Sequence, residues 1–263
     1  MKTFSPLLLI LLAGCGSSSS SSPPNTQNEA GAPETGTPAD TGTPTDTGAP
    51  DTGPPADTGT PDTGPPPRTE PFYVFVSSVT MDGSLQNGTL GTSLNPITAA
   101  SGLARADEIC KKLADNSTNT DIRNRSWMAW LSDATGSPST RFRSKDGAFA
   151  NLGYVLTNTA KTSIAANWAA LITTGPTAHI TPNQTGADFT TTQYVWTATA
   201  ENGTYDTVHT SCTNWSATTN SVLATVGTNN ATTSASVPTN WTKNNNSTCD
   251  FARPIYCFEQ PAP

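Results

Sequence analysis

Aromatic residues are confined almost entirely to the later part of this 263-residue chain, and their distribution limits where a core can form. All 6 tryptophans, all 5 tyrosines and 7 of the 8 phenylalanines lie in residues 72–263. Residues 16–71 contain no aromatic residue and hold 13 of the 22 prolines. A segment without large apolar side chains cannot bury enough surface to fold. We therefore expect one folded domain, residues 72–263, which is long enough for a single hydrophobic core.

Residues 15–71 form the low-complexity part of the chain, and we expect them to be a disordered Ser/Thr/Pro/Gly/Asp tether. The tripeptide Asp-Thr-Gly recurs five times there among prolines and threonines. Aspartic proteases use the same tripeptide, but they need two copies buried on apolar strands so that two carboxylates share a proton. The copies here have no apolar strand around them. A partly polyproline-II spacer is therefore the better interpretation.

The acidic balance of the chain also belongs to the tether. Residues 16–71 hold eight acidic side chains and one basic side chain, whereas residues 72–263 have a net charge of −1. The domain therefore lacks the basic stripe that nucleic-acid binding requires, and nucleic acid is not an expected partner.

The first residues carry the signals of an exported lipoprotein. A positive residue precedes the apolar run Leu7–Leu12, which suits a secretory signal and is too short to cross a bilayer. The following Ala13-Gly14-Cys15 resembles the lipobox of bacterial lipoproteins. We predict a signal peptide at residues 1–14 and a stable lipid anchor on Cys15; an ordinary signal with an incidental cysteine is the alternative. Because Gly16 rather than aspartate follows Cys15, we expect the protein to lie in the outer membrane, with its domain exposed at the cell surface.

Hydrophobic patterns in residues 72–263 predict an α+β domain with one main helix and several short strands. The helix ends at Asp115-Asn116, and its apolar face is formed by Leu103, Ala106, Cys110 and Leu113. Strands are predicted at residues 72–76, 127–131, 154–156, 194–198 and 254–258. Residues 165–172 fit either a strand or a helical turn. The Asn- and Thr-rich residues 216–248 are predicted to be a long polar loop region.

Four cysteines remain for the domain, and in an exported protein we expect them to form disulfides. Four cysteines allow three pairings. A zinc site is the alternative, but none of the four has a close Cys-x-x-Cys partner. The nested pairing fits best, because Cys110 with Cys257 ties the helix to the last strand. Cys212 with Cys249 then closes the loop-rich segment on itself.

Five short motifs within residues 72–260 resemble a known family. In chain order they are Gly102-Leu103-x-x-Ala106-Asp107-x-x-Cys110, Trp130-Leu131-Ser132-Asp133, Val195-Trp196-Thr197, Cys212-x-Asn214-Trp215 and Tyr256-Cys257-Phe258-Glu259-Gln260. Together they resemble a bacterial lipoprotein domain of undefined function that occurs in the leptospiral endostatin-like outer-membrane proteins. That domain is similar to the endostatin domain of collagen XVIII.

This resemblance implies a C-type-lectin-like fold. In that fold a helix cysteine pairs with the last-strand cysteine, and two inner cysteines close the long loop, which matches the nested pairing. The resemblance also implies exposure at the cell surface, where some family members are linked with binding host matrix proteins and complement regulators.

The loop region contains the candidate ligand-binding residues Asn214, Trp215 and Trp241. The tryptophans are either aromatic platforms for a sugar or protein, or core anchors, which is the usual role of tryptophan in such folds. The calcium-binding triplets of sugar-binding lectins do not occur, and residues 213–248 contain no acidic residue. The sequence therefore predicts no metal and no cofactor.

No arrangement of residues points to catalysis, so the protein is not expected to be an enzyme. His179 and His209 are isolated, and Asp107 and Glu108 point apart because neighbours on a helix face different directions. The first hypothesis is a lipid-anchored cell-surface binding or adhesion module with an unassigned protein or glycan ligand. The alternatives are a carbohydrate-binding module for envelope or environmental polysaccharide, and a structural envelope lipoprotein without a specific ligand.

Overall fold

A computed structural model describes residues 68–85, 94, 96–100, 102–229 and 240–263. The predicted signal peptide (1–14), Cys15 and nearly all of the predicted tether (15–71) lie outside these residues. In the part of the chain that is described, no helix is long and apolar enough to cross a membrane.

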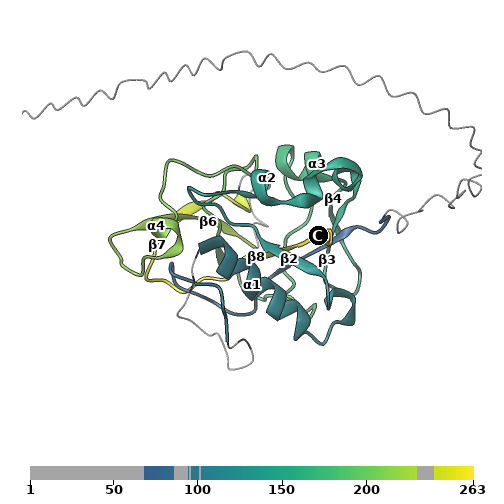
Figure 1. Cartoon of the computed structure of the whole chain (residues 1–263), viewed down its shortest axis with the longest axis horizontal. Coiled ribbons are helices and arrows are strands. Elements are labelled where there is room, and N and C mark those ends of the chain that lie inside the picture. Colours follow the sequence, from purple (N-terminus) through teal and green to yellow (C-terminus); the bar gives the residue numbers. More distant parts are fainter. Residues whose placement is uncertain (1–67, 86–93, 95, 101, 230–239) are drawn as a thin grey trace, which may run out of the picture. The chain divides into compact units, whose positions relative to one another are not determined.

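The folded part is a mixed α+β structure with few helices, which confirms the class predicted from the sequence (Figure 1). Its strands are β1 (Phe72–Val76), β2 (Ser126–Ala129), β3 (Tyr154–Leu156), β4 (Ser163–Ala165), β5 (Tyr194–Trp196), β6 (Leu223–Thr228), β7 (Asn245–Thr248) and β8 (Tyr256–Gln260). Its helices are α1 (Gly102–Asp115), α2 (Pro138–Arg141), α3 (Trp168–Thr173) and α4 (Cys212–Trp215), with 3₁₀ turns η2 (Thr120–Ile122), η3 (Arg143–Lys145) and η4 (Gly147–Asn151).

A five-stranded sheet in the order β2-β8-β1-β3-β4 forms the centre of the domain. β1 pairs antiparallel with β8 and parallel with β3, so the first and last strands of the domain lie side by side. All five residues of β1 and all five of β8 are buried. Both faces of this sheet are therefore covered.

Successive side chains of β1 enter two different hydrophobic clusters, because neighbouring residues of a strand point to opposite faces. Tyr73 and Phe75 pack on the side of α1, whereas Phe72, Val74 and Val76 pack on the other side. The sheet thus separates two cores.

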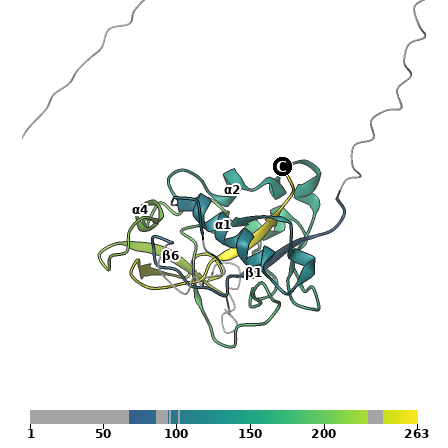
Figure 2. The same cartoon turned by 60° about the horizontal axis from the view of Figure 1, so that its bottom comes forward.

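Helix α1 covers one face of the five-stranded sheet (Figures 1 and 2). Its predicted apolar face is buried, with Ile109 and Ala114 added to it. A disulfide joins Cys110 on α1 to Cys257 on β8, with 5.5 Å between the Cα atoms. Asp107 accepts a hydrogen bond from the Ala129 amide at 2.9 Å and forms an ion pair with Arg141. It therefore links α1 to β2 and α2.

Aromatic rings fill the core on the opposite face. Trp130 lies at the centre of this cluster, with the ring centroids of its neighbours 4.6 to 5.9 Å away. The neighbours are Phe142, Trp168, Trp241 and Phe258.

A buried carboxylate fixes the chain just before β1. Glu259 on β8 is almost fully buried and accepts hydrogen bonds from Arg68 at 2.5 Å, Arg125 at 2.8 Å and the Tyr73 amide at 2.9 Å. A buried charge is stable only when it is paired in this way. The network therefore holds the first described residue against the last strand.

The second sheet contains three antiparallel strands in the order β5-β6-β7. The predicted long loop at 216–248 is wrong where β6 and β7 form. Threonine is β-branched and favours strands, so a Thr-rich segment can form a strand when a partner and a core are present. In Figure 1, β6, β7 and α4 gather at the end of the domain away from α3 and β4. The disulfide Cys212–Cys249 joins α4 to the residue after β7, which completes the nested pairing.

Candidate ligand-binding site

The structure buries both tryptophans that the sequence offered as binding platforms. Trp215 packs edge-on against Trp196 at 6.0 Å, and its indole N–H donates to the Ser132 carbonyl at 3.1 Å. Trp241 lies 4.6 Å from Trp130 in the aromatic cluster. Neither ring presents a face to a ligand, so the binding-platform interpretation is corrected in favour of core anchors.

Asn214 is exposed, but it belongs to a left-handed turn. All residues of α4 have positive φ, from 49° to 59°, although none is glycine. That conformation costs roughly 1–2 kcal/mol per residue. The Asn214 side chain accepts a hydrogen bond from the Ala134 amide at 3.2 Å and so connects the turn to the chain after β2. This contact gives Asn214 a structural role.

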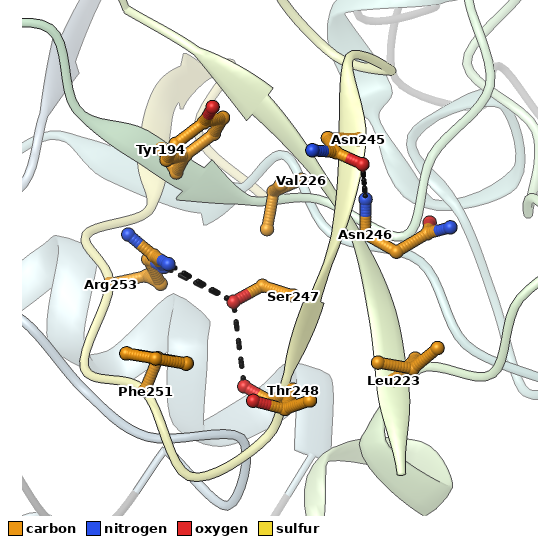
Figure 3. A pocket seen from close by; sticks show the side chains of 9 residues that line it. All are labelled: Tyr194, Leu223, Val226, Asn245, Asn246, Ser247, Thr248, Phe251 and Arg253. Atoms are coloured by element: carbon orange, nitrogen blue, oxygen red, sulfur yellow. Dashed lines mark hydrogen bonds between the residues drawn. The ribbon is translucent and has the colours of Figure 1, made fainter. Parts of the chain in front are cut away.

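A shallow hollow of about 270 Å³ opens on the three-stranded sheet (Figure 3). Tyr194 comes from β5, Leu223 and Val226 from β6, Asn245–Thr248 from β7, and Phe251 and Arg253 from the segment before β8. Thus every strand of the small sheet contributes to its lining.

Exposed apolar side chains gather around this hollow. Among the described residues, four large apolar side chains are exposed, and three of them line it: Tyr194, Leu223 and Phe251, which are 38%, 39% and 54% exposed. The fourth, Val208, borders an adjacent hollow that shares Leu223. Exposed apolar side chains that gather on one surface mark an interaction site.

Arg253 lies between two aromatic rings of the hollow. Its guanidinium carbon is 5.0 Å from the ring centroids of both Tyr194 and Phe251, within the range of cation–π attraction. Figure 3 shows the three side chains in a row along one side. Nε and Nη2 donate to Ser247 Oγ at 3.3 and 3.2 Å. Burial lowers the pKa of the Arg253 guanidinium.

Arg253 has no carboxylate partner in the described part of the chain. Its backbone is nevertheless fixed, because its N–H and C=O exchange hydrogen bonds with Met81, both at 2.8 Å. The guanidinium is therefore a positioned positive charge for which the described residues provide no counter-ion.

Strand β7 supplies the amide group of Asn245 opposite this row, whereas the neighbouring Asn246 side chain points away from it (Figure 3). Asn245 Oδ1 accepts from the Asn246 N–H at 2.8 Å, and Asn246 Nδ2 lies 2.8 Å from His209 Nε2. His209 Nδ1 is 3.6 Å from the buried carboxylate of Asp206. Burial raises the pKa of Asp206, but hydrogen bonds from Thr225 and the Val208 amide, together with the nearby Lys243, outweigh it and lower the pKa. His209 thus lies between Asn246 of β7 and the buried Asp206. No group of three metal-ligating side chains occurs among the described residues.

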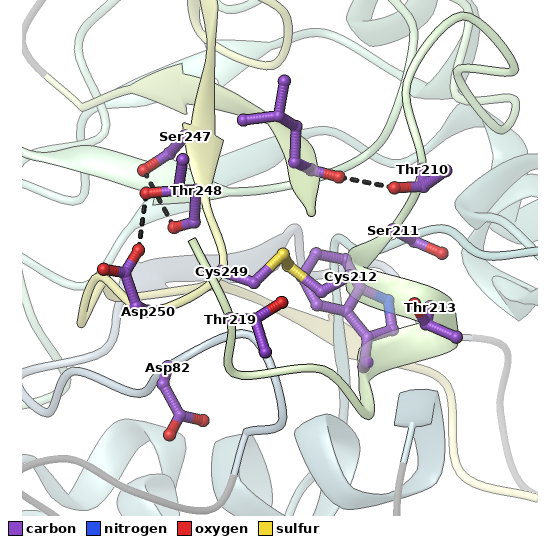
Figure 4. The surroundings of a disulfide bond; sticks show 12 residues. Asp82, Thr210, Ser211, Cys212, Thr213, Thr219, Ser247, Thr248, Cys249 and Asp250 are labelled. Carbon is purple, nitrogen blue, oxygen red and sulfur yellow. Dashed lines mark hydrogen bonds between the residues drawn. A yellow bond between two sulfur atoms is a disulfide. The ribbon is translucent and has the colours of Figure 1, made fainter. Parts of the chain in front are cut away.

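The inner disulfide supports the sheet beside the hollow (Figure 4). Cys249 follows Thr248 directly, and its carbonyl accepts a hydrogen bond from Gly83 N–H at 2.8 Å. A Cβ atom on Gly83 would overlap Cys212 Sγ, so only glycine lets this loop pack on the disulfide. The disulfide and the loop packed on it therefore support strand β7, which lines the hollow.

Sequence reasoning did not single out Tyr194, Phe251 or Arg253. Tyr194 stood in a predicted strand, and the other two stood in a short segment between a cysteine and the last strand. The one sequence signal that could have indicated the site is Phe251, followed two residues later by Arg253, in a polar segment. The pairing of Trp196 N–H with the Pro254 carbonyl at 3.0 Å brings the segments together, and no local pattern encodes it.

None of the protein-family models and none of the curated proteins compared with the chain matches it.

Proposed function

We propose that this chain is a lipid-anchored cell-surface binding module that is not an enzyme, built on a C-type-lectin-like, endostatin-like domain. The nested disulfides and the neighbouring first and last strands support this fold assignment. The motifs that carry the family resemblance lie on α1, after β2, on β5, on α4 and on β8.

One observation carries the binding role: among the described residues, three of the four exposed large apolar side chains line a single hollow that also holds an arginine without a carboxylate partner. A structural lipoprotein without a ligand has no need for such a surface, because exposed apolar groups favour aggregation. Binding therefore explains the hollow better than a purely structural role does.

The anchor is tested by producing the full chain with Cys15 intact and with Cys15→Ala in bacteria fed labelled palmitate. We expect label and membrane association with Cys15 and neither with Cys15→Ala. Protease added to intact cells should remove the domain if it lies on the outer surface. An unlabelled wild-type protein would refute the lipid anchor.

The binding role is tested with cells displaying the full chain, offered panels of matrix proteins and glycans. We expect Phe251→Ala to weaken binding to any ligand found at least tenfold, because a few large side chains contribute most of the binding energy of a contact. Val208→Ala, which removes an exposed apolar side chain outside this hollow, is the matched control. Binding that is unaffected by Phe251→Ala would contradict the assigned surface.

A further inference from the structure

We propose that the hollow on β5, β6 and β7 binds the carboxylate of an acidic sugar residue, as found in uronic-acid polysaccharides, and that Arg253 receives that carboxylate. This proposal rests on the proposed binding function and names the ligand class for the same hollow.

The first argument is charge. Arg253 is the only charged residue of the lining, and Ser247 is its only side-chain hydrogen-bond acceptor among the described residues. Two donors are directed to Ser247, which leaves further guanidinium N–H groups for a ligand. A guanidinium matches a carboxylate with two parallel hydrogen bonds. The missing counter-ion is therefore supplied by the ligand.

The second argument is the chemistry of the surrounding groups. A sugar ring has one apolar C–H face and an edge of hydroxyl groups. The half-exposed rings of Tyr194 and Phe251 offer apolar surface, and the amide nitrogen of Asn245 offers a hydrogen bond to a hydroxyl. Figure 3 shows Asn245 across the hollow from Arg253, with its amide nitrogen toward Tyr194. One side of the hollow thus suits a carboxylate and the other suits hydroxyls.

The third argument is size. The volume of about 270 Å³ is slightly below the roughly 300–1,000 Å³ of pockets that enclose a drug-sized ligand. A shallow site of this size accommodates one or two rings of a chain that continues across the surface. The single arginine matches one negative charge per sugar residue, whereas a sulfated polymer requires a cluster of basic side chains.

The experiment measures binding of the full chain, purified in detergent, to polygalacturonate and to the same polymer with every carboxylate methyl-esterified. We expect binding to the acid form and at least tenfold weaker binding to the ester, because esterification removes the charge that Arg253 recognises. This comparison uses the wild-type protein and does not depend on the folding of a variant.

Arg253→Gln should weaken binding to polygalacturonate at least tenfold and remove most of the difference between acid and ester. Arg143→Gln is the matched control, since Arg143 is an exposed arginine on η3 away from the hollow, and it should leave binding unchanged. Heparin should bind more weakly than polygalacturonate.

Three outcomes would overturn the proposal: no binding to polygalacturonate, equal binding of acid and ester, or equal losses for Arg253→Gln and Arg143→Gln. If the wild type binds only a neutral glycan or a protein, and Phe251→Ala abolishes that binding, the acidic-sugar proposal falls while the binding module stands. Failure of every ligand in both experiments would remove the proposed function as well.

Discussion

The two sheets differ in how much of their side-chain surface they leave to solvent. Each residue of β1 and β8 in the five-stranded sheet is buried, whereas in the three-stranded sheet the central strand β6 is largely buried but the edge strand β7 has only one buried residue, Ser247. A sheet covered on both faces can hold a domain together but has no free surface for a ligand. A sheet with an exposed edge strand contributes less burial and can bind. We infer that stability depends chiefly on the first sheet and recognition on the second.

Removing each disulfide by itself should show how much each one contributes to the stability of the domain. In the chain-entropy model, loss of Cys110–Cys257 costs roughly 5 kcal/mol and loss of Cys212–Cys249 roughly 4 kcal/mol, because the first closes the longer loop. We expect paired Cys→Ala changes to lower the free energy of unfolding in that order, measured by urea denaturation.

Hydrogen exchange gives the sharper test of the same variants. Without Cys212–Cys249, the amides of β6 and β7 should lose protection before those of β1 and β8, since Cys249 directly follows β7. Equal loss of protection in both sheets would break the distinction between them.

Two phenylalanines allow a direct comparison of the regions. Phe142 is fully buried beside Trp130 and Phe258, whereas Phe251 is 54% exposed at the hollow. We expect Phe142→Ala to cost about 3–5 kcal/mol of stability and Phe251→Ala less than about 0.5 kcal/mol. Urea denaturation measures both. A large loss for Phe251→Ala would mean that the hollow is part of the core.

Substitution of Gly227 tests how β6 of the small sheet packs against the aromatic core. A Cβ atom on Gly227 of β6 would overlap the backbone carbonyl of Trp241. We expect Gly227→Ala to cost about 2–3 kcal/mol, because the strand must move away from that carbonyl. Near-ultraviolet circular dichroism should report a changed tryptophan environment. Gly147→Ala provides a control for clash, since a Cβ atom there meets no neighbour within 4 Å, although its φ of +54° adds some strain.

The parts of the fold that the sequence predicted are those encoded by local patterns. Helix α1 follows from the spacing of Leu103, Ala106, Cys110 and Leu113, which repeats within a few residues. The strand at 154–156 was found with its observed bounds, and the class of the fold followed from such elements. Strands β6 and β7 were missed because a run of Thr and Asn resembles loop composition until a pairing partner is known.

The residues of the candidate site were missed for a related reason. Whether a tryptophan in a polar segment is buried depends on residues far away in the sequence, so the sequence left Trp215 and Trp241 as either surface platforms or core anchors. Contacts with Ser132 and Trp130 decide for core anchors. Tyr194 and Arg253 are far apart in sequence and meet only because β5 contacts the segment before β8. Such contacts are properties of the tertiary structure.

The smallest expected effect concerns acid stability on the α1 side of the large sheet. Glu108 accepts hydrogen bonds from the Thr98 and Ala99 amides at 2.7 to 3.0 Å and lies 3.2 Å from Lys112. Burial raises the pKa of Glu108, but hydrogen bonds from Ala99 and Thr98 outweigh it and hold the pKa at about 2. The folded-state pKa is below the unfolded value of about 4.3, so this stabilisation is present above pH 4.3 and is lost as the pH falls toward 2.

Glu108→Gln should therefore lower stability at pH 6 and have almost no effect at pH 2, measured as urea midpoints at both values. The loss at pH 6 should be below about 1 kcal/mol, because the carboxylate lies near the surface and solvent screens it. Glu70→Gln is the control, since that carboxylate is 71% exposed and should change stability little at either pH. An equal deficit for Glu108→Gln at both pH values would show that the side chain acts through packing rather than charge.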